Sequence, residues 1–265
     1  MIYKAKKSLG QNFLKSEIAL QKIIQAGEIK PDDVILEIGP GKGALTEKLL
    51  EKSQKVIAVE KDRELYEFLK NKFIKYIEMH TLILVCEDVL KFDTETYGLE
   101  PSAYKIIANI PYNITGAILK KFLTAKNQPE SMVLMVQKEV AKRILAKDGK
   151  ESIISISVKA YGKPKMVMKV PARYFSPAPK VDSAVIAIKN ISRDLFVQSS
   201  TLHKVEEFEK KFWAIVKAGF AHKRKKLGGN LKKVCQGKPL ALLKDKRAED
   251  LALEDWILLS KTEYK

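Results

Sequence analysis

Short apolar runs alternate with amphipathic segments along the first half of the chain. Five runs are apolar enough to be strands buried on both faces of a sheet, namely residues 34–38, 55–59, 82–86, 104–108 and 132–136. Between them, Leu, Ile or Phe recurs at helical spacing in residues 44–52, 63–75 and 117–123. This succession predicts an α/β fold, in which a mostly parallel sheet has helices on both sides.

The pattern changes in the second half. Apolar runs at residues 165–170 and 184–188 flank a segment rich in proline, which predicts a hairpin at one edge of the sheet. After Ile191 a polar linker leads into amphipathic helix interrupted by glycine turns. We therefore expect two domains, a sheet domain over residues 1–192 and a small helical domain over residues 193–265.

The chain is strongly basic, with a formal net charge of +17 from 49 Lys and Arg against 32 Asp and Glu. Such an excess indicates a polyanionic partner, with nucleic acid ahead of an anionic membrane surface. Residues 1–16 contain four lysines and no acid, and residues 217–233 contain seven Lys or Arg and no acid. The second cluster is equally compatible with a solvated helix face.

Cysteine and histidine are scarce and scattered. The two cysteines, Cys86 and Cys235, are too few for a disulfide framework and lack the spacing of a metal site, which favours the reducing cytoplasm. The N-terminal segment has no apolar signal region, and no stretch approaches the roughly 18 apolar residues of a membrane span. We expect a cytoplasmic monomer that needs no metal and no membrane.

A glycine-rich turn, EIGPGKG at residues 37–43, follows the first predicted strand. Glycines at such a turn let a ligand touch the backbone and let the strand pack closely on the next helix. The spacing differs from the G-x-G-x-x-G of dinucleotide sites, because one residue separates Gly39 from Gly41 and one separates Gly41 from Gly43. We predict that Gly39 and Gly41 contact a cofactor.

Acidic residues follow the next two strands. Glu60 ends the second strand, where a carboxylate can accept hydrogen bonds from both hydroxyls of a ribose. Asp88 lies just past the third strand, where a side chain can meet the adenine ring of a bound nucleoside. Acids in these positions can also be solvated caps of the strands.

The fourth strand leads into Asn109, Ile110, Pro111 and Tyr112. The exocyclic nitrogen of adenine is a weak nucleophile because its lone pair is conjugated with the ring, so acceptors that hold its hydrogens favour the transition state. The Asn109 side-chain oxygen and the Ile110 carbonyl, held extended by Pro111, can be these acceptors, and Tyr112 can stack on the base. An ordinary strand exit, with the tyrosine in the core, would have the same residues.

These four features all follow strands of a predicted parallel sheet, so their side chains are expected at one edge, where ligands bind in such sheets. A nucleoside cofactor beside a stacked amine suits S-adenosylmethionine and methyl transfer. Hydride transfer fits less well, because no histidine is placed to act as the acid.

Several longer motifs resemble one family, the ribosomal RNA adenine dimethyltransferases of the KsgA type, and the resemblance covers nearly the whole chain. The motifs are SLGQNFL at residues 8–14, EIGPGKG at 37–43, VEKD at 59–62, NIPYNI at 109–114, QKEVA at 137–141, FSPAPKVDS at 175–183 and FAHKRKKL at 220–227. The resemblance implies a Rossmann-like methyltransferase sheet with a helical RNA-binding domain.

The resemblance also implies roles. Asn12, Leu14, Gly39, Glu60, Asp88 and Asn109 would contact S-adenosylmethionine, with Glu60 on the ribose and Asp88 at the adenine. The family adds two methyl groups to N6 of each of two adjacent adenosines, in a hairpin loop near the 3′ end of small-subunit (16S) rRNA, during late ribosome assembly. The basic run Lys223, Arg224, Lys225 and Lys226 looks like the small-subunit type and would bind RNA.

Three alternatives stay open. Enzymes that methylate an adenosine of large-subunit rRNA share the first domain. The chain could also be an RNA-binding assembly factor in which methylation is secondary. A methyltransferase acting on protein glutamine uses a similar Asn-x-Pro-Tyr motif, although it would leave the basic C-terminal residues unexplained.

Overall fold

The computed structural model describes residues 5–6, 9–197, 202–222, 224–235 and 237–261. The chain divides into two compact units. Unit 1 comprises residues 1–141 and 163–191, and unit 2 comprises residues 142–162 and 192–265. Residues 142–162 therefore group with the C-terminal helices, and the expected domain boundary at 192–193 stays a prediction.

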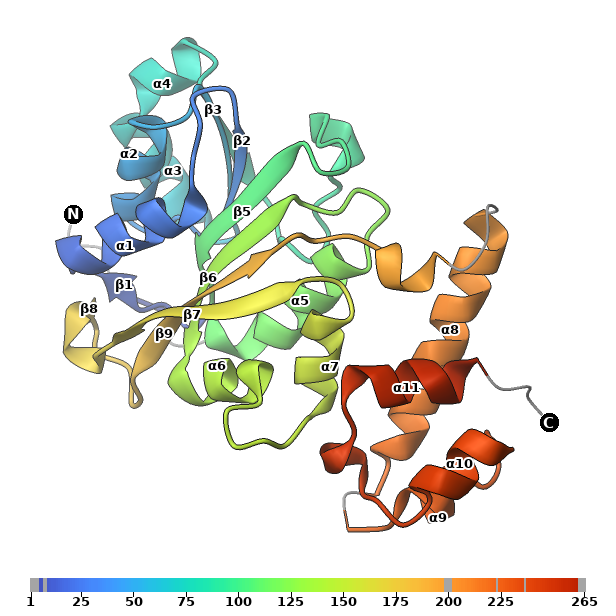
Figure 1. Cartoon of the computed structure of the whole chain (residues 1–265). Helices are drawn as coiled ribbons and strands as arrows, with labels where there is room; N and C mark the ends of the chain where they lie inside the picture. Colours follow the sequence, from blue (N-terminus) through green and yellow to red (C-terminus); the bar gives the residue numbers. More distant parts are fainter. Residues whose placement is uncertain (1–4, 7–8, 198–201, 223, 236, 262–265) are drawn as a thin grey trace. The chain divides into compact units, whose positions relative to one another are not determined.

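A seven-stranded sheet forms the centre of unit 1, with the strand order β4-β3-β2-β5-β6-β9-β7 (Figure 1). The strands are β2 (Val34–Ile38), β3 (Lys55–Glu60), β4 (Leu82–Cys86), β5 (Tyr104–Asn109), β6 (Ser131–Gln137), β7 (Lys163–Val170) and β9 (Ser183–Lys189). The five from β2 to β6 are parallel, and β9 pairs antiparallel with β6 and β7. The predicted α/β fold and the predicted edge hairpin are confirmed.

The helices of the sheet's first half occupy the predicted segments with one difference. They are α2 (Ala44–Leu50), α3 (Arg63–Lys72), α4 (Ile74–Glu78) and α5 (Thr115–Leu123). Residues 63–75 were expected to form a single helix, but the backbone leaves the helical region at Phe73, with φ −110° and ψ 22°, and α4 begins after it. The break lets the buried Phe73 ring pack against the glycine turn.

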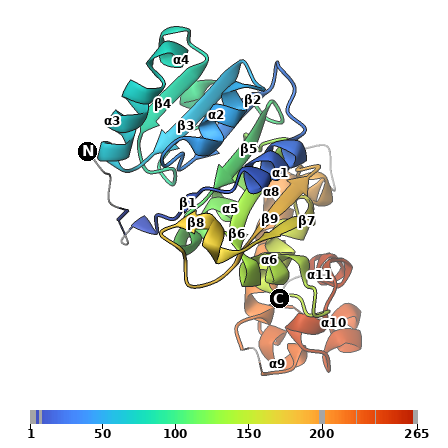
Figure 2. The same cartoon turned by 90° about the vertical axis from the view of Figure 1, so that its left-hand side faces the viewer.

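Helix α1 (Glu17–Gly27), which packs on the sheet (Figure 2), was not among the predicted elements. Its start is well defined, because the Ser16 side chain accepts a hydrogen bond from the Ala19 amide as an N-cap. Two further elements, β1 (Phe13–Leu14) and β8 (Phe175–Ser176), form a small antiparallel pair. The short helices η2 (Glu95–Tyr97), η3 (Tyr112–Ile114) and η4 (Ala172–Tyr174) complete unit 1.

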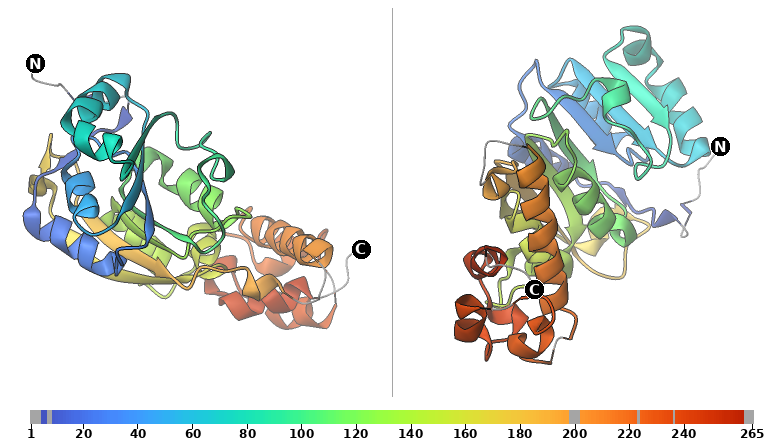
Figure 3. Two further views of the ribbon diagram at one scale, coloured as in Figure 1. Left: turned by 90° about the horizontal axis from the view of Figure 1, so that it is seen from above. Right: turned by 90° about the vertical axis from the view of Figure 1, so that its right-hand side faces the viewer.

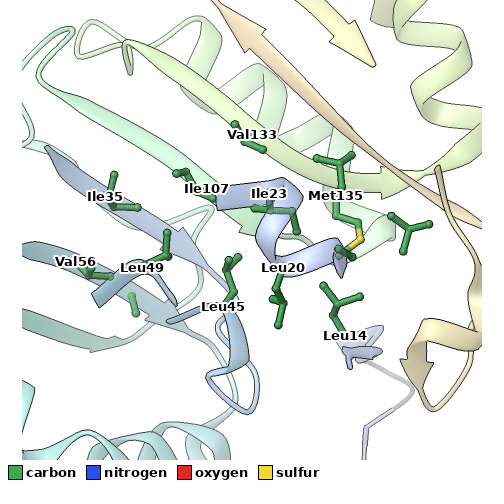
Figure 4. Close-up of a cluster of buried hydrophobic side chains, with 14 of the residues drawn as sticks. Leu14, Leu20, Ile23, Ile35, Leu45, Leu49, Val56, Ile107, Val133 and Met135 are labelled. Atoms are coloured by element: carbon green, nitrogen blue, oxygen red, sulfur yellow. The ribbon is translucent and has the colours of Figure 1, made fainter. Parts of the chain in front are cut away.

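Alternate strand residues face opposite sides of the sheet, and both faces are buried. On one face, side chains of α1 and α2 pack against strand residues, as Figure 4 shows for Leu14, Leu20, Ile23, Ile35, Leu45, Leu49, Val56, Ile107, Val133 and Met135. The β2-α2-β3 connection runs toward the β4 edge of the sheet, and the β5-α5-β6 connection runs toward the β7 edge. Because both crossovers are right-handed, α5 lies on the face of the sheet opposite α2.

Unit 2 is helical. It contains α7 (Ile153–Lys159), η5 (Asp194–Phe196), α8 (Leu202–Gly219), α9 (Leu227–Leu231), α10 (Lys238–Leu243), η6 (Ala248–Asp250) and α11 (Leu253–Ser260), while α6 (Lys138–Leu145) spans the division between the units. The longest helix, α8, packs against α11 (Figure 3, orange and red), where Gly219 lies against the Trp256 ring. Residues 142–162 join this unit through contacts such as the Glu151 amide, which donates to the Glu249 carbonyl at 2.8 Å.

The helices that the structure describes include none with the length and apolar character needed to cross a bilayer.

Gly43→Ala is expected to destabilise unit 1, because Gly43 has φ +78° and an added Cβ would lie 2.5 Å from the Phe73 ring. Gly98→Ala is the matched control, since Gly98 has φ +65° but nothing within 4 Å of the added Cβ. The control should lose about 1 kcal/mol from backbone strain, and Gly43→Ala roughly 1–3 kcal/mol more from overpacking. Urea unfolding measures both, and equal losses would contradict the steric argument.

Candidate active site

The site lies where the strand order reverses. From β2 the chain runs outward to β3 and β4, then returns to β5 on the other side of β2. Ligands of open α/β sheets bind at such a switch point, outside the carboxyl ends of the strands. A cavity of about 250 Å³ occupies this position, lined by the residues after β2, β3, β4 and β5 and by residues 9–14.

The glycine turn forms the wall beside β2. Gly39 and Gly41 have φ +66° and +60°, a left-handed conformation that other residues adopt at a cost. The Gly39 amide donates to the Val59 carbonyl at 2.9 Å, which ties the turn to β3. A Cβ on Gly41 would lie 3.0 Å from the Phe13 ring, so a side chain there would crowd the N-terminal segment in addition to straining the backbone.

Glu60 is nearly buried at the end of β3. One carboxylate oxygen, Oε2, accepts from the Gly41 amide at 3.1 Å, and the other, Oε1, accepts from the Asp62 amide at 2.8 Å. Burial raises the pKa of Glu60, and the two backbone donors work against this rise. These two hydrogen bonds fix the Glu60 carboxylate in place. Because each carboxylate oxygen has two acceptor positions, Glu60 can still accept from two ligand hydroxyls.

Glu37 is a second buried acid at this end of the sheet. Its Oε2 accepts a hydrogen bond from Thr46 Oγ1 at 2.7 Å. Burial is the main cause that raises its pKa to about 8, and the charge of Glu60 adds to the rise. The Glu37 side chain therefore carries a proton at neutral pH.

Asp88 lies at the cavity after β4 and is held from two sides. Lys61 Nζ lies 2.8 Å from its Oδ2, and the Leu90 amide donates to its Oδ1 at 3.0 Å. The hydrogen bond from Lys61 is the main cause that lowers the pKa of Asp88, so this side chain is ionised at neutral pH. Asp88 can accept from a donor on a ligand ring.

Asn109 ends β5, and its side-chain amide is oriented by the N-terminal segment. Its Nδ2 donates to the Asn12 carbonyl at 3.3 Å. Since the nitrogen is used in this way, the Oδ1 atom is the part of the amide that can accept from a ligand. Ile110 and Pro111 follow and line the same cavity, with the Ile110 side chain buried.

Tyr112 begins η3 and lines the cavity next to Pro111. Its hydroxyl is hydrogen-bonded to Ser183 Oγ at the start of β9. Burial raises the pKa of Tyr112, so the phenol is neutral. This partner could not be predicted from the sequence, because the two residues are 71 positions apart and no local signal marks their contact.

The N-terminal segment closes one side of the cavity and was not predicted to do so from the residues alone. Gln11 Nε2 donates to Asp62 Oδ2 at 2.9 Å, and Lys6 Nζ lies 2.8 Å from Asp62 Oδ1. Asp62 also caps α3, because its Oδ1 accepts from the Glu64 amide at 3.0 Å. The segment is thus attached to the residues that follow Glu60.

The structure brings together all the residues predicted for catalysis and for the cofactor. Asn12, Leu14, Gly39, Gly41, Glu60, Asp88, Asn109, Ile110, Pro111 and Tyr112 line the same cavity. Their individual roles stay predictions. In the part of the chain that is described, no group of three or more His, Cys, Asp or Glu side chains is arranged to hold a metal ion.

The predicted RNA-binding residues belong to unit 2, after α8. Arg224 and Lys225 are exposed, and Lys226 is exposed with its Nζ 2.8 Å from Asp245 Oδ1. An exposed pair of this kind contributes little to stability, so Lys226 can exchange Asp245 for a phosphate. Lys223 lies outside the described residues.

The switch-point cavity, its glycine turn and the acid after β3 are features of Rossmann-like proteins that bind a nucleoside cofactor, and the Asn-Ile-Pro-Tyr segment beside them fits an amine methyltransferase. Residues 2–263 match the family described as "Ribosomal RNA adenine dimethylase". The chain belongs to this family. It is an rRNA adenine dimethyltransferase whose methyl donor is S-adenosylmethionine.

Individual relatives support the same family assignment. The chain is 43% identical to "Ribosomal RNA small subunit methyltransferase A" of Dehalococcoides mccartyi strain CBDB1, over 96% of this chain and 86% of the relative. It is 39% identical to the protein of the same name from Fusobacterium nucleatum, over 98% of each chain.

Two solved structures are similar. A dimethyladenosine transferase from Plasmodium falciparum has a TM-score of 0.77 at 28% identity, covering 93% of this chain and 95% of that one. The 23S rRNA methyltransferase ErmE has a TM-score of 0.74 at 26% identity, covering 94% of this chain and 98% of that one.

Glu37→Gln is expected to remove a pH dependence of stability. The pKa of Glu37 rises from 4.5 to about 8 on folding, so between these values the folded chain keeps a proton that the unfolded chain has released. This group makes the free energy of unfolding fall as pH rises, by about 1.4 kcal/mol per pH unit in that window. Gln cannot titrate and mimics the protonated acid.

Urea unfolding of the cofactor-free protein at pH 5, 6.5 and 8 measures the effect. Relative to wild type, Glu37→Gln should gain stability progressively across the series. Glu100→Gln, at an exposed position, should follow wild type. Parallel pH profiles for wild type and Glu37→Gln would show that the acid is not protonated in the folded chain.

Proposed function

We propose that this chain dimethylates N6 of two adjacent adenosines in a hairpin loop near the 3′ end of small-subunit (16S) rRNA, acting as a cytoplasmic monomer on the immature subunit. The observation that carries the proposal is the placement of Asn109 and Tyr112 at one cavity with Gly39 and Glu60. A loop target fits this cavity, because unstacked bases enter a pocket at a small cost in pairing energy.

The choice of the small subunit rests on sequence rather than on fold. Both solved structures have similar TM-scores, and one of them is named for 23S rRNA. Identity to the proteins named for the small subunit is 37–43%, against 26% for the 23S enzyme, over comparable coverage. This difference supports the small-subunit target.

S-adenosylmethionine, when bound, supplies a sulfonium methyl group that an amine can attack. The residues of the chain bind and orient the two reactants. Gly39, Gly41, Glu60 and Asp88 line the cavity, and they would hold the cofactor: the glycine backbone would leave room for it, Glu60 would accept from its ribose hydroxyls and Asp88 would meet its adenine. These contacts fix the position of the methyl group and so contribute through proximity.

The acceptor base is held by residues after β5. Asn109 Oδ1 and the Ile110 carbonyl accept the two amino hydrogens, which directs the nitrogen lone pair out of the ring plane, while Tyr112 stacks on the base. The methylated nitrogen is acidic enough to lose its proton to water, so no side chain is required as a strong base.

Mass mapping of nucleosides tests the function. Immature small subunits incubated with the enzyme and labelled S-adenosylmethionine should gain N6,N6-dimethyladenosine at two adjacent positions of the 16S rRNA, and large-subunit RNA should gain none. Binding to subunits without label would favour an assembly factor, and label in large-subunit RNA would favour the other rRNA target.

In the same assay, Asn109→Ala should reduce methyl transfer by at least about a hundredfold, the effect of removing one group that stabilises a developing charge. Cofactor affinity, measured by calorimetry, should survive in part because Glu60 and the glycine turn are unchanged. Asn127→Ala is the control, since Asn127 does not line the cavity. Normal turnover by Asn109→Ala would exclude the proposed role.

Neutralising the basic residues after α8 should weaken RNA binding through electrostatics. Arg224→Gln/Lys225→Gln should lower the affinity for 16S rRNA and reduce the slope of log affinity against log salt by about 2, because each side chain neutralises one phosphate. Lys30→Gln/Lys52→Gln has the same change in charge at exposed positions before β2 and β3. Equal salt slopes for the two double variants would contradict a specific RNA contact.

A further inference from the structure

The hydroxyl of Tyr112 has a fixed partner that the proposed chemistry does not use. Tyr112 lines the cavity, yet its hydroxyl is bound to Ser183 Oγ, on a strand 71 residues further along the chain. Ser183 is fully buried and does not line the cavity. A stacking ring does not require a hydroxyl, so this contact calls for a separate explanation.

The backbone on both sides of this contact is rigid. Ser183 pairs with Gln137 of β6 and with Val170 of β7, so strands flank it on both sides. The preceding residue, Asp182, accepts from the Ala172 amide at 3.1 Å through Oδ1 and from the Lys138 amide at 3.0 Å through its carbonyl. Ser183 Oγ is therefore a well-defined point in unit 1.

The backbone of Tyr112 is also held, whereas its side chain can still rotate about two bonds. The Tyr112 carbonyl accepts from Thr115 Oγ1 at 3.1 Å, and the Ile114 amide donates to the Pro111 carbonyl at 3.3 Å. These contacts fix η3, but rotation about the side-chain bonds of Tyr112 still changes the plane of the ring. The hydrogen bond to Ser183 fixes the hydroxyl oxygen and therefore the direction of the ring axis. Because a phenol hydroxyl donates and accepts close to the plane of its ring, the same bond also favours one rotation of the ring about that axis.

We infer that Ser183 is a positioning residue, which fixes the direction of the Tyr112 ring axis, favours one plane of the ring and thereby orients the stacked acceptor base. The inference rests on the proposed function, in which Tyr112 stacks on adenine. The orientation matters because the amino nitrogen must face the methyl group and the acceptors on Asn109 and Ile110 at the same time. Loss of the anchor should affect the rate of transfer more than the binding of either reactant.

The test is a double-mutant cycle with Ser183→Ala and Tyr112→Phe in the full-length enzyme. Each single variant should lower kcat for small-subunit rRNA methylation roughly three- to tenfold, the effect of one hydrogen bond. Cofactor Kd and RNA KM should stay within about twofold of wild type. The double variant should be no slower than the slower single variant, because both changes remove the same interaction.

Ser53→Ala is the matched control for a purely structural effect. Ser53 is a buried serine of unit 1 whose Oγ bonds the Asp33 carbonyl at 2.6 Å, and it does not line the cavity. It should lower Tm about as much as Ser183→Ala and leave kcat unchanged. An unchanged kcat in Ser183→Ala, or losses that multiply in the double variant, would overturn the inference.

A second measurement is independent of the RNA target. In protein labelled with fluorotyrosine, the resonance missing from Tyr112→Phe belongs to Tyr112, and it should shift in Ser183→Ala but not in Ser53→Ala. An unmoved resonance would show that the anchor does not exist in solution. If the resonance shifts and wild type does not methylate rRNA, the proposed function fails while the contact itself stands.

Discussion

The site depends on one constraint, the reversal of strand order between β2 and β5. Parallel pairing places the carboxyl ends of β2, β3, β4 and β5 along one edge, and the reversal separates the connections that leave β2 and β5. The glycine turn can then lie opposite the segment after Asn109 without competing for the same space. In the proposed reaction, the methyl carbon of S-adenosylmethionine and the amino nitrogen of adenine would meet between the glycine turn and the segment after Asn109.

The charges at this edge differ from those of the chain as a whole. The protein has a formal net charge of +17, yet the cofactor end of the cavity contains Glu37 and Glu60, both buried, with Asp88 beside them. S-adenosylmethionine is cationic at its sulfonium and amino groups, and the demethylated product has lost the sulfonium charge. Asp88, which is ionised, gives this end of the cavity a negative charge that suits a cationic cofactor, whereas Glu37 is protonated at neutral pH and adds no charge. The basic exterior attracts RNA.

Much of this could be predicted from the sequence because it is local. The strands are short apolar runs bounded by turns, and Gly39, Glu60, Asp88 and Asn109 each follow a strand directly, so knowledge of parallel pairing was enough to bring them together. The contacts that orient these side chains could not be predicted in this way. Tyr112 with Ser183, Asn109 with Asn12 and Gln11 with Asp62 join segments distant in sequence, and no periodicity encodes them.

Helix α1 was missed for a different reason. Its apolar positions are bounded by a polar N-terminal segment and by Gly27, and a single helix ahead of the first strand has no place in an alternating pattern of strands and helices. The break at Phe73 was missed because the periodicity of residues 63–75 continues through it. Only the packing of Phe73 on Gly43 shows why the helix must end there.

The N-terminal wall of the cavity has a consequence for turnover. Its tethers to Asp62 are polar, whereas Leu14 of β1 is buried in the core and the Asn12 carbonyl orients Asn109. Four methyl transfers to one RNA need four molecules of donor. Spent donor must therefore be replaced between transfers, and the polar contacts of Lys6 and Gln11 with Asp62 are the part of this wall that can open without disturbing Leu14 or Asn109.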